Sequence, residues 1–198
     1  RASLSDRRGR MAAVPRVFVI TGPSGVGKGT LIRELRSRVP ELELSISATT
    51  RPPRPGEEDG SDYHFLSREQ FDSGVAAGDF LEWATYSGNR YGTLRSEVER
   101  RTEGGAPVVL EIEVQGARQV RETMPEAVRI FIEPPTADEL RKRLEGRGTD
   151  DPETIERRLE EARKELRAKD EFGHRVTNDD IDRAANELAG IVRSALDR

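Results

Sequence analysis

Nine residues near the start of the chain have the types and spacing that bind a phosphate. They read Gly22-Pro23-Ser24-Gly25-Val26-Gly27-Lys28-Gly29-Thr30. Glycines let the backbone curl until successive N–H groups point into one concavity. A helix that begins here adds the partial positive charge of its N-terminus. Lys28 is one of only four lysines among 33 basic residues, so its mobile point charge looks selected for this position. The stretch predicts a P-loop that binds nucleotide phosphates.

Two acidic side chains at the end of a predicted buried strand could hold a metal ion. Glu111 and Glu113 lie on the same face of that strand, because strand side chains alternate. A carboxylate beside a P-loop is the usual place for hydrated Mg²⁺. The pattern GxxxxGK[ST] has Gly29 where a metal-binding hydroxyl normally sits, and Thr30 is the nearest substitute. We expect Thr30 and Glu111 to bind Mg²⁺, in part through water. The alternative is a solvated strand end.

A proline-stiffened segment carries a pair of arginines that could bind a second phosphate. Arg51 and Arg54 are three residues apart, and paired guanidinium groups match a phosphate dianion. Tyr63 and Tyr91 could donate phenolic hydrogen bonds to the same anion. The alternatives are a solvated loop for the arginines and ordinary packing for the tyrosines.

Glu82 is a carboxylate within an otherwise apolar predicted strand, beside Trp83. If it faces a nucleotide base, it can accept two parallel hydrogen bonds from the N1–H and 2-amino groups of guanine. Adenine presents an acceptor at N1 and would be rejected. The simpler alternative is a lone charge at a sheet edge.

A strongly charged helix at 151–166 has one narrow apolar stripe and is interpreted as part of a hinged lid. Arg147, in a glycine-flanked break before it, and Arg157 and Arg158 within it could neutralise a transferring phosphoryl group. A solvent-exposed charged helix is the competing interpretation.

Hydrophobic patterning predicts the elements that position these residues. The P-loop lies between a β-branched strand at 17–21 and a helix with one apolar face. Further strands are predicted at 42–47, 62–66, 80–84, 107–113, 128–132 and 175–178. Further helices are predicted to begin at the Ser67/Gln70 capping box, near 94, at the Thr136/Glu139 capping box, at Asp151 and at Ile181.

The stretch 47–93 lacks the spacing of βαβ units and is interpreted as an insertion. The predicted fold class is therefore α/β: a P-loop NTPase core with a parallel sheet flanked by helices, a small β-rich insertion and a helical lid.

Composition limits the other possibilities. The 198 residues carry a formal charge of −4, which argues against non-specific nucleic-acid binding. The chain has no cysteine for disulfides or thiolate metal sites, and no apolar run near the ~20 residues that cross a bilayer. Residues 1–14 lack the apolar centre of a secretory signal, and we expect them to form a disordered tail. We expect the compartment to be cytoplasmic. No protein partner is inferred.

Taken together, these residues resemble the guanylate kinase family over essentially all of the chain after the tail. The most specific stretches are the run from Ser47 to Glu57 with Asp62-Tyr63-His64-Phe65, then Glu82-Trp83-Ala84, then the run from Ser87 to Thr93, Glu113-Val114-Gln115-Gly116-Ala117, and the run from Arg143 to Thr149. Each is modest evidence alone, but their order and spacing together are specific.

The resemblance implies an ATP:GMP phosphotransferase that gives ADP and GDP, with dGMP as a further acceptor. Carried over by position, Ser47, Glu82, Thr93 and Glu113 would read guanine, and Arg51, Arg54, Tyr63 and Tyr91 would hold the GMP phosphate. Lys28, Arg51, Arg147 and Arg158 would be catalytic, and Asn178 would lie near the adenine of ATP. The implied division is a core at 15–46, 94–140 and 167–198, a GMP-binding region at 47–93 and a lid at 141–166. Two alternatives remain: a non-enzymatic module that binds a phosphopeptide, and a kinase with another acceptor such as a sugar phosphate.

Overall fold

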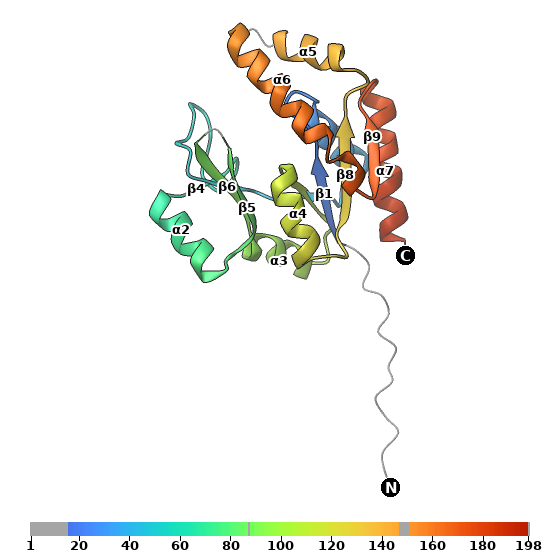
Figure 1. Cartoon of the computed structure of the whole chain (residues 1–198). Helices are drawn as coiled ribbons and strands as arrows, with labels where there is room; N and C mark the ends of the chain where they lie inside the picture. Colours follow the sequence, from blue (N-terminus) through green and yellow to red (C-terminus); the bar gives the residue numbers. More distant parts are fainter. Residues whose placement is uncertain (1–15, 87, 147–150, 198) are drawn as a thin grey trace.

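The computed structural model describes residues 16–86, 88–146 and 151–197 (Figure 1). The predicted tail at 1–14 and the predicted lid residue Arg147 lie outside these ranges. The described chain forms two sheets. The larger has five strands in the order β2 (Glu43–Leu44), β7 (Val108–Glu111), β1 (Val17–Thr21), β8 (Val128–Glu133) and β9 (His174–Thr177). The smaller has the order β4 (His64–Phe65), β3 (Ala48–Thr49), β6 (Asn89–Leu94) and β5 (Phe80–Tyr86).

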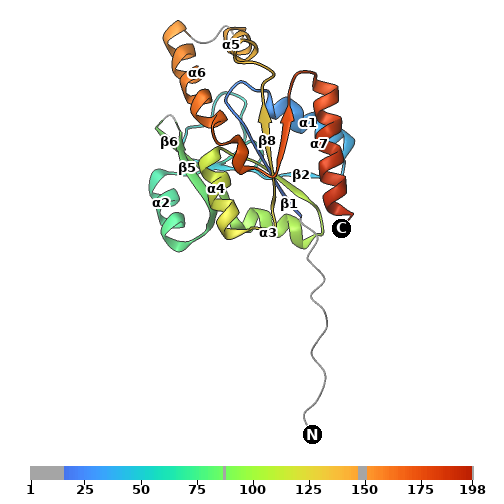
Figure 2. The same ribbon diagram turned by 45° about the vertical axis from the view of Figure 1, so that its right-hand side comes forward.

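The larger sheet is parallel throughout, and β1 lies at its centre between β7 and β8. All five residues of β1 are buried, as a strand covered on both faces requires. Helices α1 (Lys28–Arg38) and α7 (Ile181–Leu196) pack together on one face (Figure 2). Helices α3 (Arg95–Glu103) and α4 (Val114–Thr123) contribute to the core on the other. The predicted fold class is confirmed.

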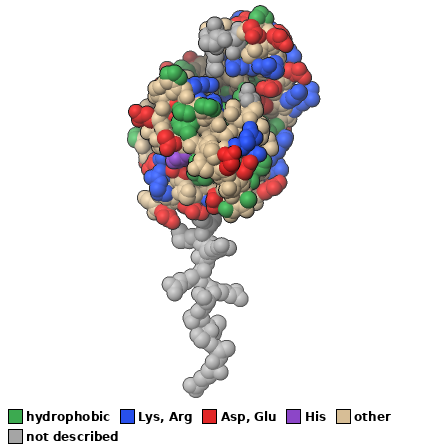
Figure 3. Space-filling view, turned by 90° about the vertical axis from the view of Figure 1, so that its left-hand side faces the viewer, with side chains coloured by type: hydrophobic (Ala, Val, Ile, Leu, Met, Phe, Trp, Pro, Cys, Tyr) green, Lys and Arg blue, Asp and Glu red, His purple; other side chains and the backbone are tan. Residues whose placement is uncertain are grey.

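The smaller sheet belongs to the segment between β2 and α3 and has a core of its own. Helix α2 (Arg68–Ala77) brings Phe71 against Phe80 of β5, with ring centroids 4.3 Å apart. The predicted capping box begins this helix: Ser67 accepts from the Gln70 N–H, and the Gln70 side chain accepts from the Ser67 N–H. Charged side chains of both signs are interspersed on the face shown in Figure 3.

Helices α5 (Ala137–Glu145) and α6 (Pro152–Leu166) form a small apolar cluster separate from the main core. Leu140 and Leu144 of α5 pack against Leu159 and Ala162 of α6. Helix α6 begins as predicted, with Asp151 as N-cap and Pro152 in the first turn. A short 3-10 helix, η1 (Lys169–Glu171), then leads to β9.

Several local predictions need correction, among them the strand predicted at 62–66, which is reduced to His64–Phe65. The strand predicted at 42–47 is only two residues long, because residues 45–47 leave the larger sheet for the smaller one. The strand predicted at 107–113 ends at Glu111, so Glu113 is the N-cap of α4 and not a strand residue. Helix α4 itself was not predicted. Thr136 accepts from the Glu139 N–H, without the reciprocal half of a capping box.

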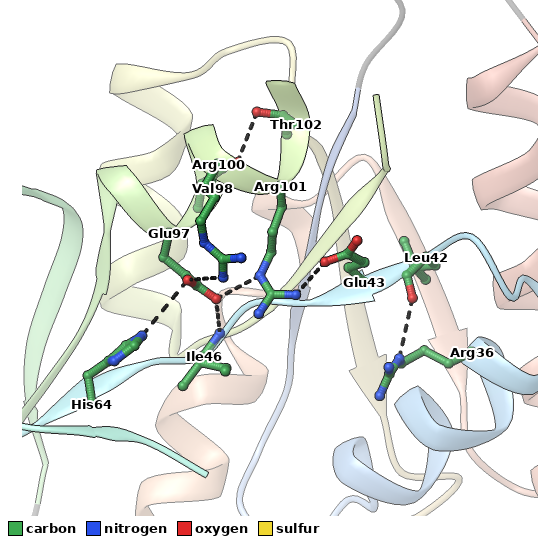
Figure 4. A network of polar contacts seen from close by, with 10 residues as sticks. All are labelled: Arg36, Leu42, Glu43, Ile46, His64, Glu97, Val98, Arg100, Arg101 and Thr102. Atoms are coloured by element: carbon green, nitrogen blue, oxygen red, sulfur yellow. Dashed lines mark hydrogen bonds and ion pairs between the residues drawn. The ribbon is translucent and has the colours of Figure 1, made fainter. Parts of the chain in front are cut away.

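A buried carboxylate joins the two sheets where the chain passes between them (Figure 4). The side chain of Glu97 in α3 is 5% exposed and accepts from the backbone N–H of Ile46 at 3.3 Å. Arg100 and Arg101 donate to it at 2.8 and 2.6 Å, and His64 of β4 lies 3.9 Å away. Burial would raise the pKa of Glu97, but these hydrogen bonds outweigh it and lower the pKa.

We expect Glu97→Ala to lower the free energy of unfolding by about 3 kcal/mol, because it removes one of the two carboxylates paired with the largely buried Arg101 and the acceptor of the Ile46 N–H. Urea denaturation measures the change. Glu99→Ala is the matched control, since Glu99 lies on the same helix with an exposed side chain. Equal effects of the two substitutions would show that Glu97 does not hold this junction.

Candidate active site

The predicted P-loop connects β1 to α1 and has the backbone shape that its glycines permit. Gly25 and Gly27 have φ of 86° and 95°, in the left-handed region that side chains disfavour. Gly27 is the N-cap of α1. The loop therefore turns directly into the helix N-terminus, where backbone N–H groups are free to bind an anion. Lys28 folds back over the loop and donates to the Gly22 carbonyl at 2.5 Å and to the Pro23 carbonyl at 3.3 Å.

Two side chains brace this loop from outside. The amide nitrogen of Asn178 donates to the Val26 carbonyl at 2.7 Å, and a β-carbon at Gly27 would lie 2.8 Å from that nitrogen. Arg143 of α5 donates to the carbonyls of Val26 and Asn178, at 3.3 and 2.9 Å. Asn178 is 6% exposed, so its amide nitrogen supports the loop in this structure. The sequence did not predict this role of Arg143, although the residue begins the run from Arg143 to Thr149 that resembles the guanylate kinase family.

A cavity of about 310 Å³ opens between the P-loop and the smaller sheet. It is lined by seven of the predicted site residues: Lys28, Ser47, Tyr63, Glu82, Tyr91, Glu111 and Glu113. These residues come from α1, from β5, β6 and β7, and from segments that connect the helices and strands. The fold therefore brings together the predicted phosphate-binding and base-reading groups, which are up to 85 positions apart in the sequence.

Glu82 is the most deeply buried acid of this cavity, with 4% of the residue exposed. Thr93, its cross-strand neighbour on β6, donates its hydroxyl to Glu82 Oε1 at 2.7 Å. Burial raises the pKa of Glu82 to about 7, and the hydrogen bonds from Thr93 offset only part of this effect. A carboxylate with so few donors keeps free acceptor capacity toward the cavity.

Glu111 and Glu113 form an acidic wall of this cavity. Partial desolvation raises the pKa of Glu111, although its side chain keeps solvent exposure, and the charge of Lys28 offsets part of this rise. Burial and a hydrogen bond with Glu113 raise the pKa of Glu165 on α6 to about 8. Sequence reasoning missed Glu165, because only the fold brings α6 to Lys28 and Glu113. Among the described residues, no group of three or more His, Cys, Asp or Glu side chains is arranged to hold a metal ion.

The predicted phosphate-binding arginines are placed differently from each other. Arg51 lies over the ring of Tyr63, 5.3 Å from its centroid, and pairs with Glu57 at 2.8 Å. The rings of Tyr63 and Tyr91 meet edge to face at 6.2 Å. Arg54 is exposed and does not line the cavity; its backbone N–H donates to Glu57. Arg51 does not line the cavity either, but it contacts Tyr63, which does. Three of the four predicted residues thus lie together, with the two tyrosines in the cavity wall and Arg51 beside them.

The remaining predicted residues lie near the P-loop. Thr30 is exposed in the first turn of α1, and its hydroxyl accepts from Arg33 at 3.4 Å. Arg158 of α6 is close enough to Tyr86 for its charge to lower the pKa of that phenol, although burial raises it more. Tyr86 also meets Ser24 of the P-loop, so the end of β5, the P-loop and α6 converge here.

A parallel sheet whose central strand leads through a glycine-rich loop and a lysine into a helix defines a P-loop nucleotide-binding protein. Within that class, the chain belongs to the guanylate kinase family. The family model described as Guanylate kinase matches residues 14–195.

Individual relatives agree with this assignment. A guanylate kinase of Gloeobacter violaceus is 56% identical over 84% of this chain and 81% of its own length. One of Streptomyces coelicolor is 54% identical over 90% and 91%. The crystal structure of guanylate kinase from Anaplasma phagocytophilum superposes with a TM-score of 0.75, at 32% identity, over 93% of this chain and 88% of the other. None of the helices described here is long and apolar enough to span a bilayer.

The raised pKa of Glu82 predicts a pH-dependent stability. A carboxyl group that titrates near 7 when folded and near 4.5 when unfolded stabilises the fold at low pH, and this contribution is lost as pH rises through 7. Glu82→Gln removes the effect. We expect the substitution to raise the free energy of unfolding by about 2–3 kcal/mol more at pH 8 than at pH 5, measured by denaturation at both values. A difference that does not change with pH would show that Glu82 is ionised throughout.

Proposed function

We propose that the chain transfers the γ-phosphoryl group of ATP directly to GMP, giving ADP and GDP, and that it also accepts dGMP. Membership of the guanylate kinase family supports the reaction. The observation that carries it within this molecule is Glu82, buried in the same cavity as the P-loop residue Lys28. A base-reading carboxylate and a phosphate-binding lysine on opposite sides of one cavity suit a nucleoside monophosphate and a nucleotide donor bound face to face.

Guanine is read by Glu82, with Ser47, Thr93 and Glu113 completing the pocket. Ionised Glu82 accepts from guanine N1–H and from the 2-amino group, while Thr93 holds Oε1 in place. Adenine would meet the carboxylate with an acceptor at N1, and a buried carboxylate left without donors is costly. Since the pKa of Glu82 is raised to about 7, guanine binding favours release of the Glu82 proton near neutral pH.

The GMP phosphate is held by Arg51, Arg54, Tyr63 and Tyr91. Arg51 is already oriented by the Tyr63 ring and by Glu57. A phosphate dianion carries more charge than the Glu57 carboxylate and can take its place as the partner of Arg51. Arg54 must turn toward the cavity for this role, and its exposed side chain is free to do so sterically.

The donor phosphates are held by residues 22–30, with Lys28 on the transferring group and Arg147 and Arg158 from the lid. Catalysis then rests on holding two anions in line and on neutralising the charge that develops between them. No covalent intermediate is needed. Asn178 braces the P-loop beside the proposed ATP site, through its bond to Val26.

Mg²⁺ accompanies ATP, and Thr30 and Glu111 are its proposed contacts on the protein, in part through water. Hydroxyl and carboxylate oxygens are the hard donors that Mg²⁺ prefers, and Glu111 lines the cavity with Lys28. The ion supplies charge neutralisation between the donor phosphates.

The proposed division of labour follows the two sheets: a core at 15–46, 94–140 and 167–198, a GMP-binding region at 47–93 and a lid at 141–166. The separate apolar clusters of the smaller sheet and of α5 with α6 support it, because each unit has its own packing. The cytoplasmic compartment stays a prediction.

A coupled assay of ADP formation with GMP, dGMP, AMP, a sugar phosphate or no acceptor tests the proposal. Turnover that strongly prefers GMP and dGMP is expected. Turnover with a sugar phosphate alone would indicate a different kinase, and ATP binding without turnover would indicate a non-catalytic binding module.

Lys28→Met is expected to lower kcat at least about a hundredfold, the scale of losing one charge contact to the transition state. Lys142→Met is the matched control, because Lys142 is an exposed lysine on α5. Steady-state kinetics with ATP and GMP measure both variants. An unimpaired Lys28→Met would remove this lysine from the mechanism.

Glu82→Gln is expected to weaken discrimination against AMP, because an amide can donate to adenine N1 where a carboxylate cannot. The ratio of kcat/KM for GMP to that for AMP should fall at least about tenfold, mainly through a higher KM for GMP. If the ratio is unchanged, another residue reads the base.

A further inference from the structure

Helix α4 of the core packs directly against β5 of the smaller sheet (Figures 1 and 2). The contacts involve Glu82 and Trp83 of that strand. A β-carbon added at Gly116 would collide with Glu82 Oε2, and would lie 2.9 Å from Cδ and 3.3 Å from Cγ of the same side chain. The Glu82 carboxylate therefore lies against the bare backbone of α4. Any side chain at 116 would require the end of the Glu82 side chain to move.

Space, and not backbone shape, explains the glycine at 116. Gly116 lies within the regular helix and has no positive φ. Glycine inside a helix destabilises it by about 1 kcal/mol relative to alanine. This local cost is offset only by the close approach of Glu82.

One turn further along α4, Gln119 contacts the next residue of the same strand. Its Oε1 accepts from the Trp83 N–H at 3.1 Å, and its Nε2 donates to the Trp83 carbonyl at 2.6 Å. Strand β5 is at the edge of the smaller sheet, so these two backbone groups face away from its partner strand β6. The Gln119 amide satisfies both, as a neighbouring strand would.

We propose that Gly116 and Gln119 are positioning residues for guanine selection, which fix the carboxylate of Glu82 in the plane where it meets the base. The proposal rests on the function proposed above and extends it from the residue that reads the base to those that hold that residue. Gly116 sets how deep the carboxylate lies, and Gln119 fixes the backbone of the strand that carries it.

These contacts matter because Glu82 has little else to hold it. Among the described residues, its hydrogen-bond donors come from Thr93 alone. Two parallel hydrogen bonds to a planar base require the carboxylate plane to be fixed, and hydrogen bonds weaken steeply when misaligned. A carboxylate that can tilt can also turn away from a base that lacks matching donors. The energetic cost of binding that base is then smaller, and discrimination weakens.

Gly116→Ala tests the depth of the carboxylate without weakening the helix, since alanine is the better helix former. The new methyl group must displace the end of the Glu82 side chain. We expect KM for GMP to rise about tenfold, kcat and KM for ATP to change less than threefold, and the melting temperature to stay within a few degrees of wild type. Inosine monophosphate, which lacks the 2-amino group, is the second acceptor, and the GMP-to-IMP ratio of kcat/KM should fall about fivefold or more.

Gln119→Leu tests the attachment of the strand, because leucine is similar in size but cannot bond Trp83. The same rise in KM for GMP and fall in the GMP-to-IMP ratio are expected. Gln115→Leu is the matched control: the same substitution on the same helix, one turn earlier, at an exposed residue. Should Gln119→Leu fail to fold, Gln119→Glu keeps the acceptor for the Trp83 N–H, removes the donor and places a carboxylate against the Trp83 carbonyl, so the same rise in KM for GMP and fall in the GMP-to-IMP ratio are expected.

The outcomes separate this inference from the function on which it rests. A wild-type chain that does not prefer GMP overturns the proposed function. A wild-type preference that persists unchanged in both Gly116→Ala and Gln119→Leu overturns the positioning role. Loss of melting temperature with an equal loss of activity toward both acceptors would make these residues structural only.

Discussion

The cost of burying the Glu82 carboxylate is the constraint that organises the active site. An acid removed from water needs donors, and here the protein provides those of Thr93. In the proposed function, the remaining need is met by a ligand with two adjacent N–H donors, which is what guanine presents. The smaller sheet, its edge strand β5 and the supporting helix α4 hold that carboxylate in the cavity that Lys28 also lines. On this proposal, selectivity comes from an unmet electrostatic demand more than from shape.

The cations of the site have carboxylate partners in this structure. Arg51 pairs with Glu57, and Lys28 lies near the acids Glu111 and Glu165. Such pairs reduce the repulsion between like charges in a cavity that holds several charged side chains. Phosphate groups carry more charge than single carboxylates, so substrate binding exchanges one set of anions for a stronger one. The acidic wall and the arginines are parts of the same charge balance.

Local signals in the sequence predicted the parts of the fold that depend on neighbouring residues. The P-loop between its strand and helix, the cap at Ser67 and the Asp151–Pro152 helix start were all correct. Six of the seven cavity residues could be named because each belongs to a short, specific stretch, and Glu111 could be named from its place at the end of a predicted strand. What could not be predicted depends on contacts between residues far apart in the sequence. Glu97 accepts from the N–H of Ile46 over 51 positions, and Arg143 donates to the carbonyl of Val26 over 117 positions. Helix α4 was missed for a related reason, since its glycine at 116 has a purpose only when Glu82 is beside it.

Two glutamates of this chain show how the same type of side chain can have two different roles. Glu82 and Glu97 are 4% and 5% exposed, yet the pKa of Glu97 is lowered while that of Glu82 is raised to about 7. Glu97 is surrounded by donors from Arg100, Arg101 and Ile46, so its charge is compensated by the protein and it fastens two elements together. Glu82 has no such compensation among the described residues, and a purely structural role would leave its burial unexplained. A buried acid whose donors are too few, beside a cavity, is where a ligand must complete the set, and the glycine and glutamine behind it keep that incomplete site in one geometry.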